Sequence, residues 1–260
     1  MRLRGIGLAL GFLAGTSVAL AQPVTVTYVA NEGILISGDS VRVLIDGLHR
    51  PYRPEYLSLS DDLQAAAETG QAPFDGIDLL LVSHNHRDHF SPAAVGAYLA
   101  AVPGARLWSS PQIIGAACDD GCELVWPGFG RADSVVLDRV SVTFLGLRHV
   151  NERHRSVQNL GHVVEVGGRR ILHVGDAELS ESNFASFDLP GRGIDVALLP
   201  AWYLLSSADR ALVDRLIGAR RVIAVHVDPS DGERVDRLMQ ETFPAGRAFF
   251  RSMEDTVRVR

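Results

Sequence analysis

The chain has 260 residues, 47% of them hydrophobic, which is enough for one large domain with a buried core or for two small domains. All 25 basic residues are arginine, so mechanisms that need a lysine amine, such as Schiff-base formation, are excluded. The formal net charge of -6 disfavours nucleic acid as the main partner, because no broad basic field is available to bind phosphates.

The first residues have the pattern of a secretory signal peptide. Arg2 and Arg4 precede an apolar run at positions 6–20, and Ala19-Leu20-Ala21 provides an A-x-A cleavage site. A retained membrane anchor is the alternative, but the run is short and is interrupted by glycine, threonine and serine. We therefore expect residues 1–21 to be removed, leaving a periplasmic or secreted protein without a transmembrane segment.

Cys118 and Cys122 are the only cysteines, and they flank the turn-like segment Asp119-Asp120-Gly121. In an oxidising compartment such a close pair can form a small disulfide, and two free thiols are the other option. Two cysteines alone do not make a structural zinc site.

Residues 22–260 show no internal repeat, low-complexity tract or long linker, so we predict a single domain. The N-terminal part of this domain alternates apolar and polar residues between turn signals. This pattern predicts an antiparallel meander with strands at 24–28, 34–36 and 41–45.

The next stretch introduces helices. Ser60 and Gly70 mark the start and the end of a helix, and a continuous apolar run at 77–82 predicts a buried strand. An amphipathic helix with a serine cap and a first-turn proline follows at 92–102.

The second half of the chain again alternates between strand and helix patterns. The predicted strands lie at 140–147, 163–166, 171–174, 194–199 and 222–225, and the predicted helices at 209–217 and 233–240. Strand meanders that alternate with helices predict a layered, mixed α/β sandwich.

The segment from His84 to His89 reads His-Asn-His-Arg-Asp-His and lies between the buried strand and the capped helix. In an extended segment alternate side chains point to the same side, so one loop can direct several donors to one point. Imidazole nitrogens and carboxylate oxygens are ligands that suit zinc. A polar loop that uses its histidines only for hydrogen bonds is the alternative, but four donors in six residues favour a metal-binding loop.

Three further donors follow predicted strands. His149 and His226 each come after an apolar run, and Asp176 follows the strand at 171–174. A single histidine or aspartate after a strand is commonplace, so each of them alone is a weak signal. Together with the loop they give seven donors, more than one tetrahedral site uses, and the sequence therefore predicts two metal ions.

With these residues identified, the sequence resembles the metallo-beta-lactamase superfamily over nearly all of residues 22–260. The resemblance rests on His84, His86, Asp88, His89, His149, Asp176 and His226. It implies an α/β fold, a four-layer αββα sandwich of two mixed sheets, with a dinuclear metal site at one edge of the sheets. We expect one domain of this kind over 22–260.

The resemblance also implies how the ligands divide between two metal ions. One ion would be held by His84, His86 and His149, the other by Asp88, His89 and His226, and Asp176 would bridge them. His154 is an alternative third ligand of the first site, but His149 directly follows a strand. We expect two Zn²⁺ ions per chain, with iron or manganese as alternatives; His86 favours zinc, because diiron relatives usually carry glutamate there.

The expected activity is metal-assisted hydrolysis of a small molecule. Zinc lowers the pKa of bound water to about 7, which provides a nucleophile at neutral pH, and it polarises the attacked carbonyl or phosphoryl oxygen. We assign catalytic roles to Asp88 and Asp176 among the site residues. The resemblance associates a bridging aspartate with lactonases, thioesterases, phosphodiesterases and nucleases, so we expect a small ester, lactone or phosphodiester as substrate. A beta-lactamase and a non-catalytic metal-binding or assembly protein are the alternatives.

Two secondary motifs suggest a branch of the superfamily. Leu198-Leu199-Pro200-Ala201-Trp202 and Asn159-Leu160-Gly161 resemble relatives of ascorbate-6-phosphate lactonase and the phospholipase-D-like enzymes that cleave N-acylethanolamine phospholipids. The chain lacks the glycine-rich loop expected after Pro200, which leaves the type of substrate open.

The remaining candidates are residues that would surround the metals. We expect Trp202 and Tyr203 to form an apolar wall of the cleft, with core packing as the alternative. One of Arg87, Arg153 and Arg155 would meet a phosphate or carboxylate of the substrate, unless they are all solvated.

Three other histidines have weaker assignments. His162 and His173 are expected to pack beside the ligands or to orient them, each through one hydrogen bond, and His49 to line the cleft or to lie at the surface. The sequence specifies no oligomeric state.

Overall fold

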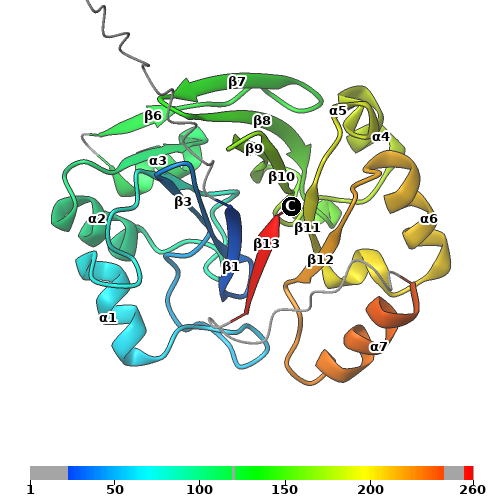
Figure 1. Cartoon of the computed structure of the whole chain (residues 1–260), viewed down its shortest axis with the longest axis horizontal. Coiled ribbons are helices and arrows are strands. Elements are labelled where there is room, and N and C mark those ends of the chain that lie inside the picture. Colours follow the sequence, from blue (N-terminus) through cyan, green and yellow to red (C-terminus); the bar gives the residue numbers. More distant parts are fainter. Residues whose placement is uncertain (1–22, 119–120, 243–254, 260) are drawn as a thin grey trace, which may run out of the picture.

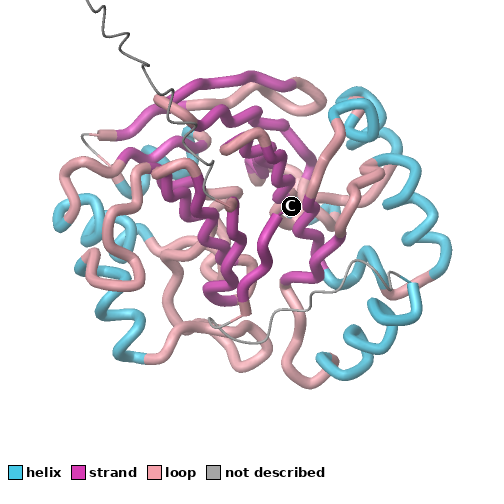
Figure 2. The backbone as a smooth tube through the Cα atoms, viewed as in Figure 1, coloured by secondary structure: helices cyan, strands magenta, loops and turns pink. Residues whose placement is uncertain are grey.

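We obtained a computed structural model of the chain, which describes residues 23–118, 121–242 and 255–259 (Figures 1 and 2). The predicted signal segment, residues 1–21, lies outside these ranges. Two β-sheets pack face to face in the middle of the molecule, and helices cover the outer face of each sheet (Figure 2). Within the described ranges no helix combines the length and the apolar character that crossing a bilayer would require.

The first sheet contains seven described strands and combines antiparallel and parallel pairs. It is built from β13 (Thr256–Val259), β1 (Val24–Ala30), β2 (Gly33–Gly38), β3 (Val41–Ile45), β4 (Leu79–Leu81), β5 (Arg106–Ser109) and β6 (Cys122–Leu124), in that order. The pairs β1–β2 and β2–β3 are antiparallel, which confirms the predicted meander. From β3 to β6 the strands run parallel, because α1 (Asp61–Thr69), α2 (Pro92–Ala101) and α3 (Pro111–Ala117) provide the connections.

The second sheet contains six described strands and is also mixed. Its order is β12 (Val222–Val225), β11 (Val196–Pro200), β10 (Arg169–His173), β9 (Gln158–Val166), β8 (Val140–Arg148) and β7 (Ala132–Leu137). The helices of this half are α4 (Glu181–Phe184), α5 (Leu189–Arg192), α6 (Ser207–Leu216) and α7 (Gly232–Thr242), with 3-10 helices η1 (Glu152–His154), η2 (Ala185–Phe187) and η3 (Ala201–Leu204). In Figure 1, α4 to α7 lie together on one side of the molecule and α1 to α3 on the opposite side.

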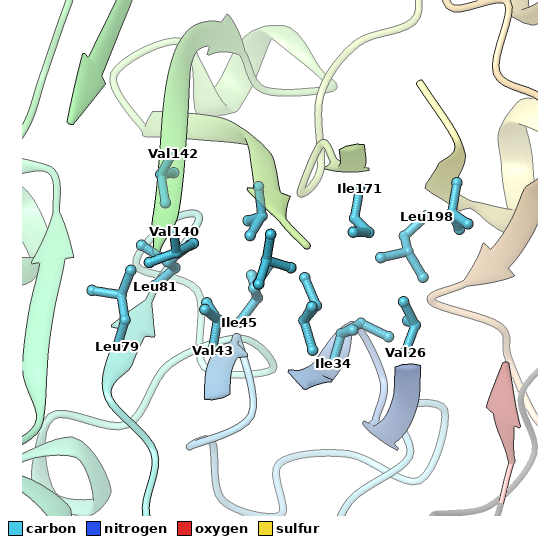
Figure 3. Close-up of a cluster of buried hydrophobic side chains, with 14 of the residues drawn as sticks. Val26, Ile34, Val43, Ile45, Leu79, Leu81, Val140, Val142, Ile171 and Leu198 are labelled. Carbon is cyan, nitrogen blue, oxygen red and sulfur yellow. The ribbon is translucent and has the colours of Figure 1, made fainter. Parts of the chain in front are cut away.

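Three layers of buried apolar side chains join the two sheets to each other and to the helices on their outer faces. The central layer lies between the two sheets and includes Ile45, Leu81, Val142 and Leu198 (Figure 3). A second layer joins the second sheet to its helices, and a third joins the first sheet to α1, α2 and α3. Alternation along the strands explains the division, because successive side chains of a strand point to opposite faces of its sheet. The predicted αββα sandwich of two mixed sheets is therefore confirmed.

Most predicted elements are present with shifted ends, and the helix caps behave as the sequence indicated. The Ser60 and Ser91 hydroxyls accept hydrogen bonds from the backbone N–H groups of Leu63 and Ala94 at the starts of α1 and α2. Strand β9 begins at Gln158 and not at 163, because its first residues pair with β8 although they are not uniformly apolar.

Several strands and helices were absent from the prediction: β5, β6, β7, β13, α3, α4 and α5. Strand β7 is mostly exposed and so lacks the burial pattern of a strand, whereas β13 alternates exposed and buried residues over only four positions, a short signal in a sequence. Cys118, which caps α3, forms a disulfide with Cys122 at the start of β6. The structure therefore contains the disulfide and not two free thiols.

The strands place the ends of several segments at one edge of the sandwich. Strands β3 and β4 are parallel, so Asp46 and Ser83 follow them at the same edge, where the β1–β2 turn also lies. In the second sheet β8, β10 and β12 run in one direction and end before His149, Val174 and His226. The predicted metal ligands follow these strand ends.

Candidate metal centre

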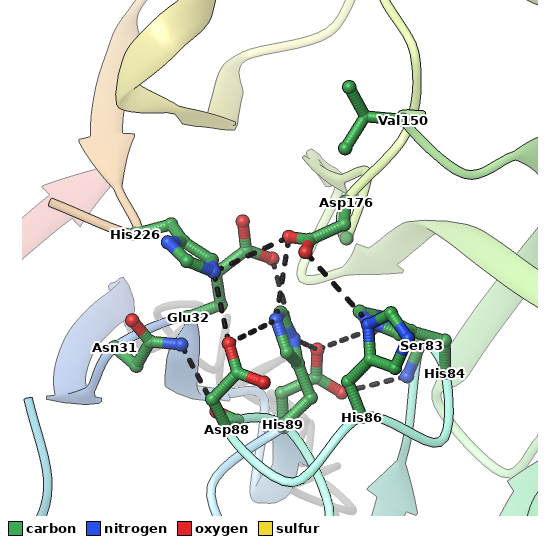
Figure 4. A network of polar contacts seen from close by, with 12 residues as sticks. Asn31, Glu32, Ser83, His84, His86, Asp88, His89, Val150, Asp176 and His226 are labelled. Carbon is green, nitrogen blue, oxygen red and sulfur yellow. Dashed lines mark hydrogen bonds and ion pairs between the residues drawn. The ribbon is translucent and has the colours of Figure 1, made fainter. Parts of the chain in front are cut away.

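The structure brings all seven predicted ligands together at this edge, and Figure 4 labels all of them except His149. Four of them come from the loop after β4, and His149, Asp176 and His226 come from the second sheet. They form two groups that could each hold a metal ion, the first with His84, His86, His149 and Asp176, the second with Asp88, His89 and His226.

In the first group three imidazole nitrogens converge. The Nδ1 atom of His86 lies 3.0 Å from Nε2 of His84 and 3.1 Å from Nε2 of His149. Oδ2 of Asp176 lies 3.5 Å from Nε2 of His149 and 3.9 Å from Nε2 of His84. Nitrogen and oxygen donors at these separations suit a tetrahedral site.

In His84 and His149, the hydrogen bond made by Nδ1 determines that Nε2 is the nitrogen without a proton. The Ser83 hydroxyl donates to Oδ2 of Asp46 at 2.5 Å, so it accepts from Nδ1–H of His84 at 3.0 Å. The Nδ1–H of His149 donates to the carbonyl oxygen of Val150 at 2.6 Å. Nε2 of both histidines is therefore the unprotonated nitrogen, as a metal ligand requires.

The second group is built around Asp88, whose Oδ2 lies 3.2 Å from Nε2 of His226 and 3.6 Å from Nε2 of His89. Nδ1–H of His89 donates to Oδ2 of Asp46 at 2.9 Å, which leaves its Nε2 free for a cation. Oδ1 of Asp176 completes the group, at 3.4 Å from Nε2 of His89 and 3.6 Å from Nε2 of His226. The two oxygens of Asp176 thus face different groups.

His154, the alternative ligand of the first site, lies on η1 outside both groups. Its ring packs against those of His86 and His149, and its Nε2 accepts a hydrogen bond from Nε of Arg153 at 2.9 Å. The lone pair of Nε2 is thereby occupied. The geometry favours His149 at this position, as its place after a strand predicted.

Unpartnered buried atoms show that the residues fit a cation. Nε2 of His89 and Oδ1 of Asp176 are buried, and neither has a hydrogen-bond partner among the residues that the structure describes. Both atoms point toward other donors of the second group. Such atoms are costly in a protein interior unless a metal ion or another partner satisfies them.

Electrostatics keep two histidines of the first group, His84 and His86, neutral. Burial and the neighbouring His89 hold the pKa of His84 well below its usual range. Burial and the nearby His149 lower the pKa of His86 to about 4. Neutral imidazoles are the form that binds metal, so these two side chains can accept a cation near neutral pH.

The carboxylates of the site are ionised. Burial alone would raise the pKa of Asp176, but the neighbouring His226 and His89 outweigh it and hold this pKa well below the usual range. Burial opposes ionisation of Asp88 as well, yet the His226 hydrogen bond and His89 lower its pKa to about 2. Conversely, burial would lower the pKa of His89, but Asp176 and Asp46 raise it well above its usual range.

Sequence reasoning missed two buried carboxylates beneath these ligands. Asp46 follows β3 and receives hydrogen bonds from Ser83 and His89, and Glu32 lies in the β1–β2 turn. Asp46 carried the same signal as Asp176, a polar residue directly after a strand. Glu32 has no such signal, because Asn31-Glu32-Gly33 has the composition of an ordinary turn.

A cleft of about 340 Å³ opens onto the metal ligands. Its wall is formed by Tyr56, His86, Asp88, His149, Val150, Asn151, Arg153, His154, Asp176, Trp202 and His226. The rings of Tyr56 and Trp202 approach His226 edge to face, with centroids 5.3 and 5.0 Å away. These two rings therefore lie beside the second group, whereas Arg153 is bonded to His154, whose ring packs against His86 and His149 of the first group.

Several residues predicted to surround the cleft lie elsewhere. Trp202 lines it, but Tyr203 is buried in the core and its hydroxyl donates to the carbonyl oxygen of Ala177 at 2.6 Å. Arg87 stacks on the ring of Tyr52, and Arg155 pairs with Glu152. Of the three arginines only Arg153 lines the cleft.

The remaining histidines also differ from the predictions. His173 has the expected hydrogen bonding, with Nε2 donating to the carbonyl oxygen of Glu32 at 3.1 Å. His162 packs against Phe144, but neither of its ring nitrogens has a hydrogen-bond partner in the described part of the chain, so the predicted hydrogen bond was wrong. His49 neither lines the cleft nor lies at the surface, because it is 3% exposed.

Comparison with known proteins agrees with this fold and site. A family model described as "Beta-lactamase superfamily domain" matches residues 25–226, and the chain belongs to this superfamily. A UPF0173 metal-dependent hydrolase of Thermus thermophilus is 27% identical over 243 residues, which cover 86% of this chain and 95% of that protein. The predicted membership is thereby confirmed.

Solved structures extend the likeness to the fold. Igni18, a metallo hydrolase of Ignicoccus hospitalis, aligns with a TM-score of 0.62 and 18% identity over 90% of this chain and 97% of its own. The metallo-beta-lactamase fold protein YhfI of Bacillus subtilis aligns with a TM-score of 0.59 and 15% identity over 89% of this chain and 97% of its own. The architecture is that of the metallo-beta-lactamase fold.

Proposed function

We propose that the protein is a metal-dependent hydrolase of small molecules that works with two divalent cations. The observation that carries the proposal is the position of Asp176, whose Oδ2 faces His84 and His149 while its Oδ1 faces His89 and His226. A carboxylate placed in this way is suited to bridge two ions. The description of the Thermus relative as a metal-dependent hydrolase supports the same activity.

We propose that the ligands divide between the two ions as the family resemblance implies. His84, His86 and His149 would hold one ion, Asp88, His89 and His226 would hold the other, and Asp176 would bind both. Bound there, the ions would lower the pKa of a water molecule and polarise the scissile carbonyl or phosphoryl group. Nitrogen-rich ligands at tetrahedral spacing favour Zn²⁺ in the first site.

The protein's own side chains would bind and orient the substrate. Burial, Asp88 and Asp176 all raise the pKa of Tyr56, so its phenol stays protonated and can donate a hydrogen bond at the cleft wall. Trp202 offers an apolar surface beside His226, and Arg153 can bind a phosphate or carboxylate on the side of the first group. This polarity suits a small ester, lactone or phosphodiester with an apolar group at one end and an anionic group at the other.

We also propose that the protein is exported. The pattern of residues 1–21 supports export, and so does the Cys118–Cys122 disulfide, because disulfides persist in oxidising compartments. Fractionation of cells that express the full chain, with sequencing of the mature N-terminus, tests this point. A protein that keeps residues 1–21 and stays in the reducing cytosol would contradict it.

The hydrolase proposal is tested with purified protein loaded with Zn²⁺. Substrates would be p-nitrophenyl phosphodiesters, thioesters, acyl lactones and a cephalosporin, and metal content would be measured by elemental analysis. We expect two ions per chain, and loss of both metal and hydrolysis in Asp176→Ala and His86→Ala. The variant Asp195→Asn, which changes a buried carboxylate bonded to Arg220 outside the site, serves as the control.

Each result of this screen has a distinct meaning. Turnover of a phosphodiester, thioester or lactone that disappears with the metal supports the proposal. A protein that binds two ions but turns over no member of the panel would be a metal-binding protein without hydrolase activity. Hydrolysis of the cephalosporin alone would contradict the proposed substrate class.

A further inference from the structure

The turn between β1 and β2 carries a buried carboxylate that the proposed mechanism does not use. Glu32 is 1% exposed, and neither of its carboxylate oxygens has a hydrogen-bond partner within residues 23–118, 121–242 and 255–259. An ionised carboxylate in a protein interior is costly unless it is paired or coordinates a metal. Oε2 of Glu32 lies 3.4 Å from Nε2 of His173 and 3.9 Å from Nδ1 of His89, but both of these N–H groups donate their hydrogen bonds elsewhere, so no described residue fully satisfies the carboxylate.

Two hydrogen bonds of Asn31 hold this turn against the candidate metal centre. The Asn31 side chain donates from Nδ2 to the carbonyl oxygen of Asp88 at 3.1 Å. The backbone N–H of His226 donates to the carbonyl oxygen of Asn31, also at 3.1 Å. Two segments that carry proposed ligands are thus bonded to the residue before Glu32, and the position of Glu32 relative to them is fixed.

One set of donors near Glu32 cannot hold a cation. Glu32, Asp46 and His173 lie close together, but Asp46 already accepts hydrogen bonds from the Ser83 backbone, the Ser83 hydroxyl and His89. Nδ1 of His173 accepts from the N–H of Gly175 at 3.3 Å, so its Nε2 is protonated and donates to the Glu32 carbonyl. His173 therefore has no lone pair free for a metal, and Asp46 has three of its roughly four acceptor sites already occupied.

The other set of donors is free. Glu32, His89 and Asp176 each offer a ligand atom, and the three atoms lie within 4.8 Å of one another. Nε2 of His89, Oδ1 of Asp176 and both carboxylate oxygens of Glu32 are all buried atoms without a hydrogen-bond partner in the described chain. Figure 4 shows the Glu32 side chain entering this cluster beside His226 and Asp176.

We propose that Glu32 is a further carboxylate ligand of the cation held by Asp88, His89, His226 and Asp176. The inference rests on the proposed function, because it assigns a residue to one of its two metal sites. It makes the two sites chemically different. The first would have three imidazoles and one carboxylate, and the second two imidazoles and three carboxylates. An oxygen-rich site of higher coordination number suits Mn²⁺ or Fe²⁺ better than a nitrogen-rich tetrahedral one.

The test is a titration of the metal-free full-length chain with Mn²⁺, in which free Mn²⁺ is measured by its electron paramagnetic resonance signal. The variants are Glu32→Gln, which is nearly isosteric, and Glu32→Asp, which keeps the negative charge but withdraws it by one methylene. Asp195→Asn again serves as the control for loss of a buried carboxylate. Far-UV circular dichroism checks that every variant is folded.

We expect the wild type and Asp195→Asn to bind two Mn²⁺ ions per chain. Both Glu32 variants should keep one ion and bind the other at least about tenfold more weakly. Wild-type affinity for both ions in Glu32→Gln would overturn the inference. Wild-type affinity in Glu32→Asp alone would also overturn it, since charge without reach would then suffice. If the wild type bound no Mn²⁺ or Zn²⁺, the proposed function itself would fail, whereas two ions in every protein would contradict only the role of Glu32.

Discussion

At the scale of single residues, the hydrogen bond made by one ring nitrogen of a histidine determines whether the other ring nitrogen can bind a cation. His84, His89 and His149 donate one ring N–H to Ser83, Asp46 and the Val150 carbonyl, which leaves the other nitrogen free for a cation. His173 donates and accepts within the protein, and His162 does neither among the described residues. The sequence shows nine histidines but not these partners, so it identified the cluster correctly and misjudged His162 and His49.

His162 provides a test of burial without hydrogen bonding. Burial and the nearby His173 lower its pKa to about 3, compared with 6.5 in the unfolded chain. Above pH 6.5 His162 is neutral in both the folded and the unfolded state. Between pH 6.5 and pH 3 only the unfolded state binds a proton at His162. The free energy of unfolding therefore falls by about 1.4 kcal/mol for each pH unit as the pH drops from 6.5 toward 3. The variant His162→Leu should not show this pH-dependent loss of stability.

The measurement is urea unfolding of the wild type and His162→Leu at several pH values. At pH 7 we expect the two to be similar, or the variant to be more stable, because leucine removes two unsatisfied polar atoms. Between pH 6.5 and pH 5 the difference should grow in favour of the variant by about 2 kcal/mol. A difference that stays constant over this range would mean that His162 finds a polar partner in the folded protein.

Arg153 provides a test of substrate charge. Its guanidinium lines the cleft, and no described carboxylate forms an ion pair with it. We expect Arg153→Gln to raise KM for an anionic phosphodiester by about tenfold or more, since a charge-assisted hydrogen bond contributes about 1.5–3 kcal/mol. KM for a neutral p-nitrophenyl ester should not change. Arg155→Gln is the matched control, because Arg155 pairs with Glu152 outside the cleft; equal effects of the two variants would refute a specific role for Arg153.

At the scale of elements, the site was predictable because its ligands follow strands. The buried run before His84, the strand before His149 and the hairpin before Asp176 all have clear patterns, and parallel strands end at a common edge. Glu32 could not be found in this way, since it occupies a turn whose polar residues usually face solvent. Its burial depends on the packing of the turn against the second sheet, through the hydrogen bond from His226 to Asn31, and no local pattern reports such a contact.

The turn after β10 shows how an element sets the position of a ligand. Gly175 has a φ of +56° directly before Asp176, and a Cβ atom there would lie 2.6 Å from Oδ1 of Asn159 and 2.8 Å from Cβ of Ser83. Gly168, in the β9–β10 turn, has a φ of +70° but open space around its Cα. Both substitutions to alanine therefore impose the cost of a left-handed residue, about 1–2 kcal/mol, and only Gly175→Ala also creates close contacts.

We expect Gly168→Ala to lower the free energy of unfolding by about 1–2 kcal/mol and to keep the wild-type metal content. Gly175→Ala should be destabilised further and should lose metal, because relieving the contacts moves Asp176 away from both groups of donors. Urea unfolding and elemental analysis of the two variants provide the comparison. Full metal content in Gly175→Ala would show that the turn tolerates the side chain without displacing Asp176.

At the scale of the whole molecule, the candidate metal centre joins the two halves of the sandwich. The loop after β4 and the β1–β2 turn belong to the first sheet, whereas His149, Asp176 and His226 belong to the second. The central apolar layer holds the sheets together, but at the edge the contacts are made by imidazoles and carboxylates. Cations bound there would attach the halves to each other, and an unfolded chain would not preserve that arrangement.

Removal of the metals should therefore destabilise the entire fold. A ligand present at about 1,000 times its Kd stabilises the native state by about 4 kcal/mol, and for a chain of this size 1 kcal/mol corresponds to about 2–4 °C in Tm. We expect chelation to lower Tm by about 8–16 °C, as measured by calorimetry with elemental analysis of the same samples. Asp176→Ala, which loses the bridging carboxylate, should melt near the temperature of the chelated wild type and respond little to chelator. A wild-type protein that is verified to be metal-free and still melts at the original temperature would show that the cations are not part of what holds the two sheets together.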